Sequence, residues 1–293
     1  MHHLLLSLII NAIALICCVH SAPLADFLQL SKRAAAVPCA NQIDTLFVFG
    51  DSYSAVNGEK GSRKTWTLFE SPDSVTNNPV IRDGTTAGAP NWNQYLTECY
   101  EGIPQNCPAH LFNVAYNGAT VDTNLVQPRT PDVSDFIAQV QGWQKHVKPQ
   151  VEYQKALAAI WFGINDVGHS LDTSDADISA LLGKDVDEYF DQLELLYSGG
   201  LRTFMIINVP PFERTPKFSP QADILVPRIM QYNELIDNHI TAFTTKHQDV
   251  AVIKIDAHER FTYYLDHASQ YGVQDTTSSC KEKEGDEATD CGQ

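Results

Sequence analysis

Short apolar runs alternate with longer amphipathic stretches along most of the chain. Five runs rich in β-branched and aromatic residues have the length of buried strands, and they cover residues 43–49, 111–115, 156–162, 203–209 and 250–255. In four longer stretches apolar residues recur every three or four positions, as in helices with one buried face. These stretches are 132–146, 174–198, 222–247 and 257–269.

Continuous apolar strands separated by helices are typical of a parallel sheet with helices on both faces, so we expect one α/β domain. The stretch 222–247 contains Pro227, and we expect the helix to break or to start late there. Residues 54–109 are rich in Gly, Pro, Asn and Ser, and we expect them to be mostly irregular, with one helix around 92–98.

The N-terminus has the pattern of a segment that is removed from the mature protein. Residues 4–19 are almost entirely apolar and small residues follow them, which is typical of a signal peptide over residues 1–21. The alternative is a membrane anchor, but the run is short and lacks a basic flank. Lys32-Arg33 indicates a pro-segment over residues 22–33, although a charged linker explains it equally well. We therefore expect a secreted, extracellular protein whose folded domain covers residues 34–293.

The net charge of the chain limits the classes of partner that it can bind. A formal net charge of −16 over 293 residues disfavours nucleic acid and anionic membrane surfaces, whereas neutral carbohydrates and small esters remain compatible. The cysteine spacing matches no zinc pattern, and we expect a monomer without metal or organic cofactor. In a secreted chain we expect local disulfides Cys99–Cys107 and Cys280–Cys291, with Cys39 left over.

Polar motifs follow the predicted strands at the point where a parallel sheet places its sites, at the carboxyl ends of the strands. Residues 50–52 read Gly-Asp-Ser after the first strand, and 163–166 read Gly-Ile-Asn-Asp after the third. Ser52 can act as the nucleophile of an acyl transfer. The backbone N–H groups of Ser52 and Gly118 and the carboxamide of Asn165 can stabilise an oxyanion. Each motif alone is equally compatible with a capped turn, but together they favour an active site.

The segments "FGDSYS", "NVAYNGAT" and "WFGINDVG", in this order, resemble the first three signature blocks of the SGNH hydrolases, also called GDSL esterases. The resemblance runs from about residue 44 to the end of the chain. It implies a flavodoxin-like α/β/α sandwich with a five-stranded parallel sheet. It also implies a serine hydrolase in which Ser52 is the nucleophile and Gly118 and Asn165 complete the oxyanion hole.

Three further segments point to one subgroup of this family. "GAPNWNQYL", "NVPPFERTP" and "QYNELI" are similar to segments of secreted fungal acetylesterases, which remove acetyl groups from plant cell-wall oligosaccharides. The expected substrate is therefore a small acyl ester on a carbohydrate. The sequence leaves two alternatives open, which are a lipase or phospholipid esterase of the same fold and a non-catalytic carbohydrate-binding relative.

The fourth signature block of the family, an Asp-x-x-His pair near the C-terminus, does not occur in this sequence. The remaining candidates for the general base are His258, which lies beside Asp256 just past the last strand, and His169 in the third block. A serine hydroxyl is a weak nucleophile without a base. We therefore expect the chain as written to be an incomplete domain and a poor esterase, unless His258, held by Asp256, replaces the missing pair.

Overall fold

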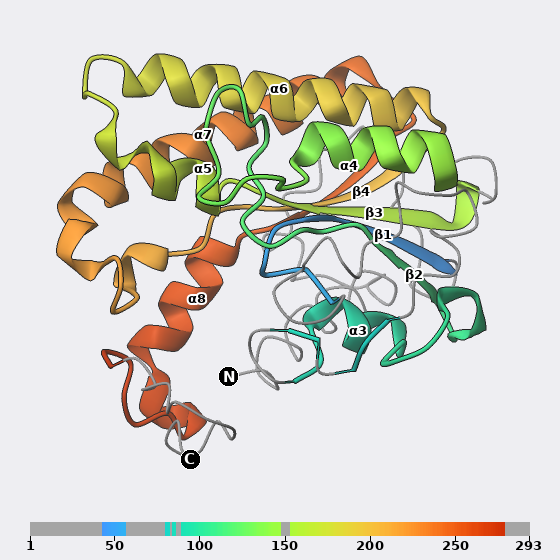
Figure 1. The fold of residues 1–293 in the computed structure, drawn as a ribbon, viewed down its shortest axis with the longest axis horizontal. Helices are drawn as coiled ribbons and strands as arrows, with labels where there is room; N and C mark the ends of the chain where they lie inside the picture. The colour runs from blue at the N-terminus through green and yellow to red at the C-terminus, as the bar shows by residue number, and fades with distance from the viewer. Residues whose placement is uncertain (1–42, 57–79, 83, 86–88, 148–152, 279–293) are drawn as a thin grey trace, which may run out of the picture.

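The computed structural model describes residues 43–56, 80–82, 84–85, 89–147 and 153–278, without the side chains of residues 146, 147 and 154. In this part of the chain five parallel strands form one sheet in the order β2-β1-β3-β4-β5 (Figure 1). The strands are β1 (Thr45–Gly50), β2 (His110–Asn113), β3 (Ala156–Trp161), β4 (Thr203–Ile207) and β5 (Ala251–Ile255). Each strand falls on one of the five predicted runs, so the expected sheet is confirmed.

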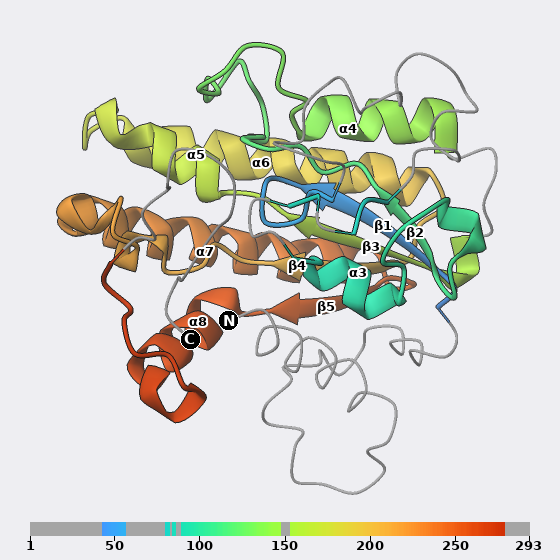
Figure 2. The same cartoon turned by 60° about the horizontal axis from the view of Figure 1, so that its bottom comes forward.

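Helices cover both faces of this sheet. The described helices are α3 (Trp92–Thr97), α4 (Phe136–Gly142), α5 (Ile164–His169), α6 (Ile178–Ser198), α7 (Ala222–Lys246) and α8 (Ala257–Asp266). Figures 1 and 2 show α4, α6 and α7 on one face, and α3 and α8 on the other. The arrangement is the expected three-layer α/β/α sandwich. None of the helices described is both long and apolar enough to span a bilayer.

The core consists of two layers, one on each face of the sheet. Successive residues of a strand point to opposite faces, so Phe47 and Phe49 of β1 pack under α4, whereas Leu46 and Val48 pack on the side of α3. All of these side chains are almost completely buried. This two-sided burial explains why the strands read as unbroken apolar runs instead of alternating polar and apolar positions.

Several helices differ from their predicted bounds, and two of the differences have a clear physical reason. We predicted a helix over 132–146, but α4 begins at Phe136 because the Asp135 carboxylate accepts a hydrogen bond from the Ala138 N–H (2.8 Å) and so caps the helix. The predicted break at Pro227 is wrong, since α7 continues through it. Pro227 lacks the N–H for the Asp223 carbonyl, but Asp223 is exposed, so water can satisfy that carbonyl.

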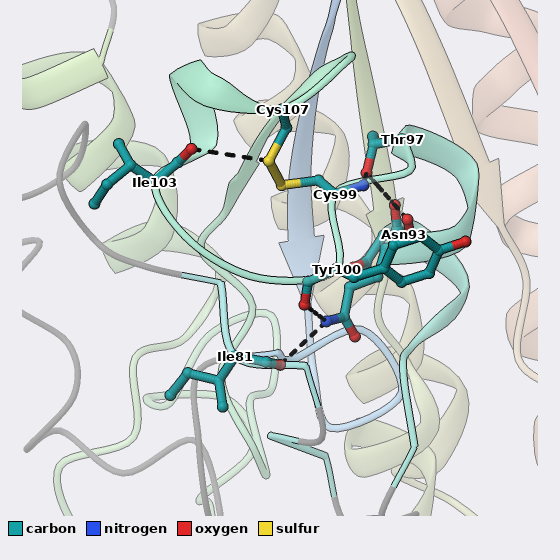
Figure 3. Close-up of a disulfide and its surroundings, with 8 residues drawn as sticks. Ile81, Asn93, Thr97, Cys99, Tyr100, Ile103 and Cys107 are labelled. Carbon is teal, nitrogen blue, oxygen red and sulfur yellow. Dashed lines mark hydrogen bonds between the residues drawn. A yellow bond between two sulfur atoms is a disulfide. The ribbon is translucent and has the colours of Figure 1, made fainter.

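The disulfide Cys99–Cys107 is present and joins the end of α3 to the turn that precedes β2 (Figure 3). Next to it, the buried Gln94 side chain donates to the carbonyls of Ile81 and Tyr100, which fixes the same segment. The predicted signal peptide, the pro-segment and the pair Cys280–Cys291 lie outside the described residues.

Candidate active site

The structure brings three of the predicted motifs to one edge of the sheet. In the sheet order β2-β1-β3, the strand that ends in Gly50 lies between the strands that lead to Gly118 and Asn165. Ser52 occupies the turn that follows β1 and is half-buried. No residue in the described ranges forms a hydrogen bond to the Ser52 hydroxyl.

The turn that carries Ser52 is built around Asp51. The Asp51 carboxylate accepts a hydrogen bond from the Tyr53 N–H (2.9 Å), and its backbone carbonyl accepts from the N–H groups of Ser54 and Ala55. Its second carboxylate oxygen has no hydrogen-bond partner within the described ranges. Burial, with a smaller contribution from the charge of Asp166, raises the pKa of Asp51 to about 7.

The loop after β2 forms the second wall of the site. The Tyr116 N–H donates to the Gly50 carbonyl (2.9 Å), which holds this loop against β1. Gly118 has a φ of 82°, in the left-handed region that favours glycine. The Asn165 amide donates to the Ala119 carbonyl (2.8 Å), so the third motif is joined directly to this loop. An amide nitrogen carries two hydrogens, and the second one has no partner among the residues described.

The Asp166 carboxylate joins the loop after β2 to the turn after β3. One carboxylate oxygen accepts from the Val121 N–H (2.8 Å) and the other from the Gly163 N–H (3.1 Å). Gly163 has a φ of 110°, and a Cβ there would lie 2.5 Å from the Tyr232 ring. Asp166 therefore supports this turn and joins it to the loop after β2.

Two polar residues beneath the site could not be identified as part of it from the sequence. Asp185 of α6 lies close enough to Asp166 to feel its charge, and it accepts a hydrogen bond from the Tyr232 hydroxyl of α7 (2.9 Å). Burial raises the pKa of both carboxyl groups, and the charge of Asp166 raises that of Asp185 further. The one indication in the sequence was the position of Asp185, which lies beside Leu182 and Val186 on the apolar face of a predicted helix.

His258 and Asp256 do not form the expected pair. The Asp256 carboxylate caps α8 by accepting from the Glu259 N–H (2.9 Å), and it also accepts from the Asn208 side chain (3.0 Å). His258 donates its backbone N–H to Asn208 (3.1 Å), but no hydrogen bond joins its ring to Asp256. β5 lies three strand spacings from β1, about 14 Å, and α8 runs away from the sheet (Figure 2).

Four of the other histidines with described side chains contact groups elsewhere, and His110 lies at the start of β2, at the opposite end of the sheet. The His169 ring lies 3.1 Å from the Gln127 carbonyl, and burial together with the charge of Arg129 lowers its pKa. His239 and His247 contact carboxylates of α6, and the His267 ring contacts the Tyr263 carbonyl. The general base therefore stays a prediction. Within the described ranges, no three His, Cys, Asp or Glu side chains are placed to hold a metal ion.

Aromatic side chains line the floor of this edge. The Tyr53 ring stacks on Trp161, with centroids 5.3 Å apart, and Trp92 packs edge-on against Trp161. Both tryptophans are buried in the core, whereas Tyr53 is half-buried beside Ser52. Of these three rings, Tyr53 is the one that is only partly buried.

In a parallel α/β/α sandwich the carboxyl edge of the sheet is where ligands bind, and here it gathers a serine, a glycine and an asparagine. Residues 46–291 match the profile of the GDSL-like Lipase/Acylhydrolase family. An acetylesterase from Thermothelomyces thermophilus is 32% identical over 245 residues, which cover 79% of this chain and 76% of that protein. The chain therefore belongs to the GDSL lipase/acylhydrolase family and is a carboxylic ester hydrolase.

Two solved structures are similar at a lower level. One is an acetyl xylan esterase, with a TM-score of 0.38 and 14% identity, over 77% of this chain and 84% of that one. The other is an α/β hydrolase enzyme from the metagenome of Lake Arreo, Spain, with a TM-score of 0.38 and 15% identity, over 76% of this chain and 81% of that one.

Proposed function

We propose that this protein is a secreted serine esterase that removes small acyl groups, acetyl above all, from carbohydrates through an acyl-enzyme. The observation that carries the proposal is the hydrogen bond from the Asn165 amide to the Ala119 carbonyl (2.8 Å). This hydrogen bond holds the Asn165 side chain beside Gly118. Gly118 follows β2, which is the strand next to β1, and Ser52 follows β1.

The reaction follows from these positions. The Ser52 oxygen attacks the ester carbonyl carbon while its proton passes to a general base, and a tetrahedral oxyanion forms. The N–H groups of Ser52 and Gly118 and the second amide hydrogen of Asn165 donate to that oxyanion. Collapse breaks the bond to the alcohol, which leaves with the proton. Water then attacks the acyl-serine and releases the carboxylic acid.

The substrate class rests on two observations of different kinds. The relative from Thermothelomyces thermophilus bears the name acetylesterase, which favours an acetyl group. A net charge of −16 is compatible with a neutral carbohydrate, and the half-buried Tyr53 ring beside Ser52 is placed to stack on a sugar.

The test compares hydrolysis of p-nitrophenyl acetate and of acetylated xylo-oligosaccharides by the wild-type chain and its variants. Ser52→Ala should remove nearly all activity, and Asn165→Ala should lower kcat roughly 100- to 1000-fold because one oxyanion donor is lost. His258→Ala tests the candidate base and should keep most of the activity, since the Asp256 carboxylate caps α8 and does not contact the His258 ring. Full activity of Ser52→Ala would overturn the proposal, and a loss in His258→Ala equal to that in Ser52→Ala would identify His258 as the base. A preference for long-chain esters would favour the lipase reading instead.

A further inference from the structure

The carboxyl end of β1 is held by a side chain from a distant helix. Gln139 of α4 is completely buried, and its amide accepts one hydrogen bond from the Gly50 backbone and donates another to it. The Gly50 N–H donates to the Gln139 side-chain oxygen (3.0 Å), and the Gln139 nitrogen donates to the Gly50 carbonyl (2.9 Å). The same nitrogen donates to the Ser134 carbonyl (2.9 Å), so both amide hydrogens are used.

The Gln139 amide makes the hydrogen bonds that a neighbouring strand would make where the pairing of β1 with β2 ends. The pairing of β1 with β2 stops at Val48 and Asn113, two residues before Gly50. The Gly50 carbonyl still receives the Tyr116 N–H, but the N–H of Gly50 has no backbone acceptor on that side. A buried N–H without an acceptor is costly, and Gln139 supplies the missing acceptor.

The position of Gly50 determines where Ser52 lies. Gly50 is two residues before Ser52, and Asp51 between them is completely buried, so the turn is rigid on both sides of Gly50. A Cβ at Gly50 would lie 2.8 Å from the Trp161 carbonyl, which shows how closely the backbone of β1 approaches β3 here. A small rotation of the Gly50 peptide would therefore move the Ser52 hydroxyl and N–H together.

We propose that Gln139 is a positioning residue for the reaction, whose amide holds the Gly50 backbone so that Ser52 points at the ester carbonyl. Gln139 does not touch the substrate and acts only through Gly50. The inference rests on the proposed role of Ser52 as the nucleophile.

The chain offers a matched control at another strand end. Asn233 of α7 makes the same two-way contact with Val209, just past β4: it accepts from the Val209 N–H (2.9 Å) and donates to the Val209 carbonyl (3.0 Å). Asn233 is also buried. β4 lies two strand positions from β1, so the loss of this contact should cost stability without moving Ser52.

The experiment compares Gln139→Met with Asn233→Leu. Both substitutions put an apolar side chain of similar length in place of an amide that accepts from a backbone N–H and donates to a backbone carbonyl. Turnover of p-nitrophenyl acetate, Tm and amide hydrogen exchange of peptides covering Phe49–Ser54 are measured on each. In Gln139→Met kcat should fall roughly 10- to 100-fold while KM changes less than about threefold, because orientation is lost and binding is not. Exchange at Gly50 should be roughly five- to tenfold faster, as for the loss of one hydrogen bond.

Asn233→Leu should lower Tm by a similar amount but leave kcat within about threefold of wild type. If Gln139→Met does not fold, Gln139→Glu is measured instead, because it keeps the acceptor for the Gly50 N–H. Equal kcat in the Gln139 and Asn233 variants would overturn the inference. If the wild-type chain hydrolyses no ester, the proposed function fails, and the exchange measurement still decides: faster exchange at Gly50 supports the positioning role and unchanged exchange rejects it.

Discussion

Replacing Asp51 by Asn should make the free energy of unfolding less dependent on pH. The Asp51 carboxyl is completely buried, one of its oxygens has no hydrogen-bond partner in the described part of the chain, and its pKa is raised from 3.8 to about 7. The folded state therefore binds the Asp51 proton more tightly than the unfolded chain does. The stability that this carboxyl contributes is complete below pH 3.8 and is lost as the pH rises through about 7.

The size of the effect follows from the two pKa values. One pKa unit corresponds to about 1.4 kcal/mol, so a rise from 3.8 to about 7 makes the folded state about 4 kcal/mol less stable at neutral pH than at pH below 4. Asn has the same shape, its side-chain oxygen can still accept the Tyr53 N–H, and it does not titrate. The substitution removes this pH dependence and leaves the turn in place.

Urea unfolding of both proteins at several pH values between 4 and 8 tests the argument. The quantity to plot is the free energy of unfolding of Asp51→Asn minus that of wild type, since groups common to both proteins, including Asp166 and Asp185, largely cancel. This difference should increase by about 4 kcal/mol from pH 4 to pH 8. A difference that stays constant within about 0.5 kcal/mol would show that the Asp51 carboxyl is not held protonated by burial.

Two further substitutions test the local geometry. Gly163→Ala should lower the free energy of unfolding by roughly 2–4 kcal/mol, because its Cβ would lie 2.5 Å from the Tyr232 ring at a φ of 110°. Gly118→Ala should cost only about 1–2 kcal/mol, because its Cβ would meet no atom of the described residues within 4 Å. Equal losses in urea unfolding would contradict this reasoning. Removing the Cys99–Cys107 disulfide with the double substitution to Ser should cost about 2.5 kcal/mol, since the bridge closes a short loop of sequence separation 8; a Tm that does not change on reduction of the wild-type protein would contradict it.

Much of the sheet follows from local sequence, and so does the edge at which the candidate site lies. The apolar runs are continuous because both faces of the sheet are covered, and this pattern requires no knowledge of long-range contacts. The motifs at Ser52, Gly118 and Asn165 come directly after strands, so the rule for carboxyl ends was sufficient to place them together. The beginning of α4 was missed because either Asp132 or Asp135 could cap a helix, and only the three-dimensional path of the chain selects Asp135.

The contacts that hold the site together lie beyond the reach of local patterns. Gln139 is 89 residues from Gly50, and Tyr232 is 47 residues from Asp185. In the sequence, Gln139 and Asp185 are ordinary polar residues on amphipathic helices. Only packing against the sheet shows that each lies on a buried face, where a polar group needs a partner.

These polar contacts explain why a motif alone does not define an active site here. Ser52, Gly118 and Asn165 come from three separate strand ends, and no direct hydrogen bond joins their side chains in the described part of the chain. Gln139 holds the first strand end, while Asp166 and Asn165 hold the second and third to each other. Gln139 and Asp166 are completely buried in a low-dielectric interior, where a lost contact leaves a buried group unsatisfied. The arrangement of the catalytic edge therefore depends on the helices behind the sheet as much as on the three motifs.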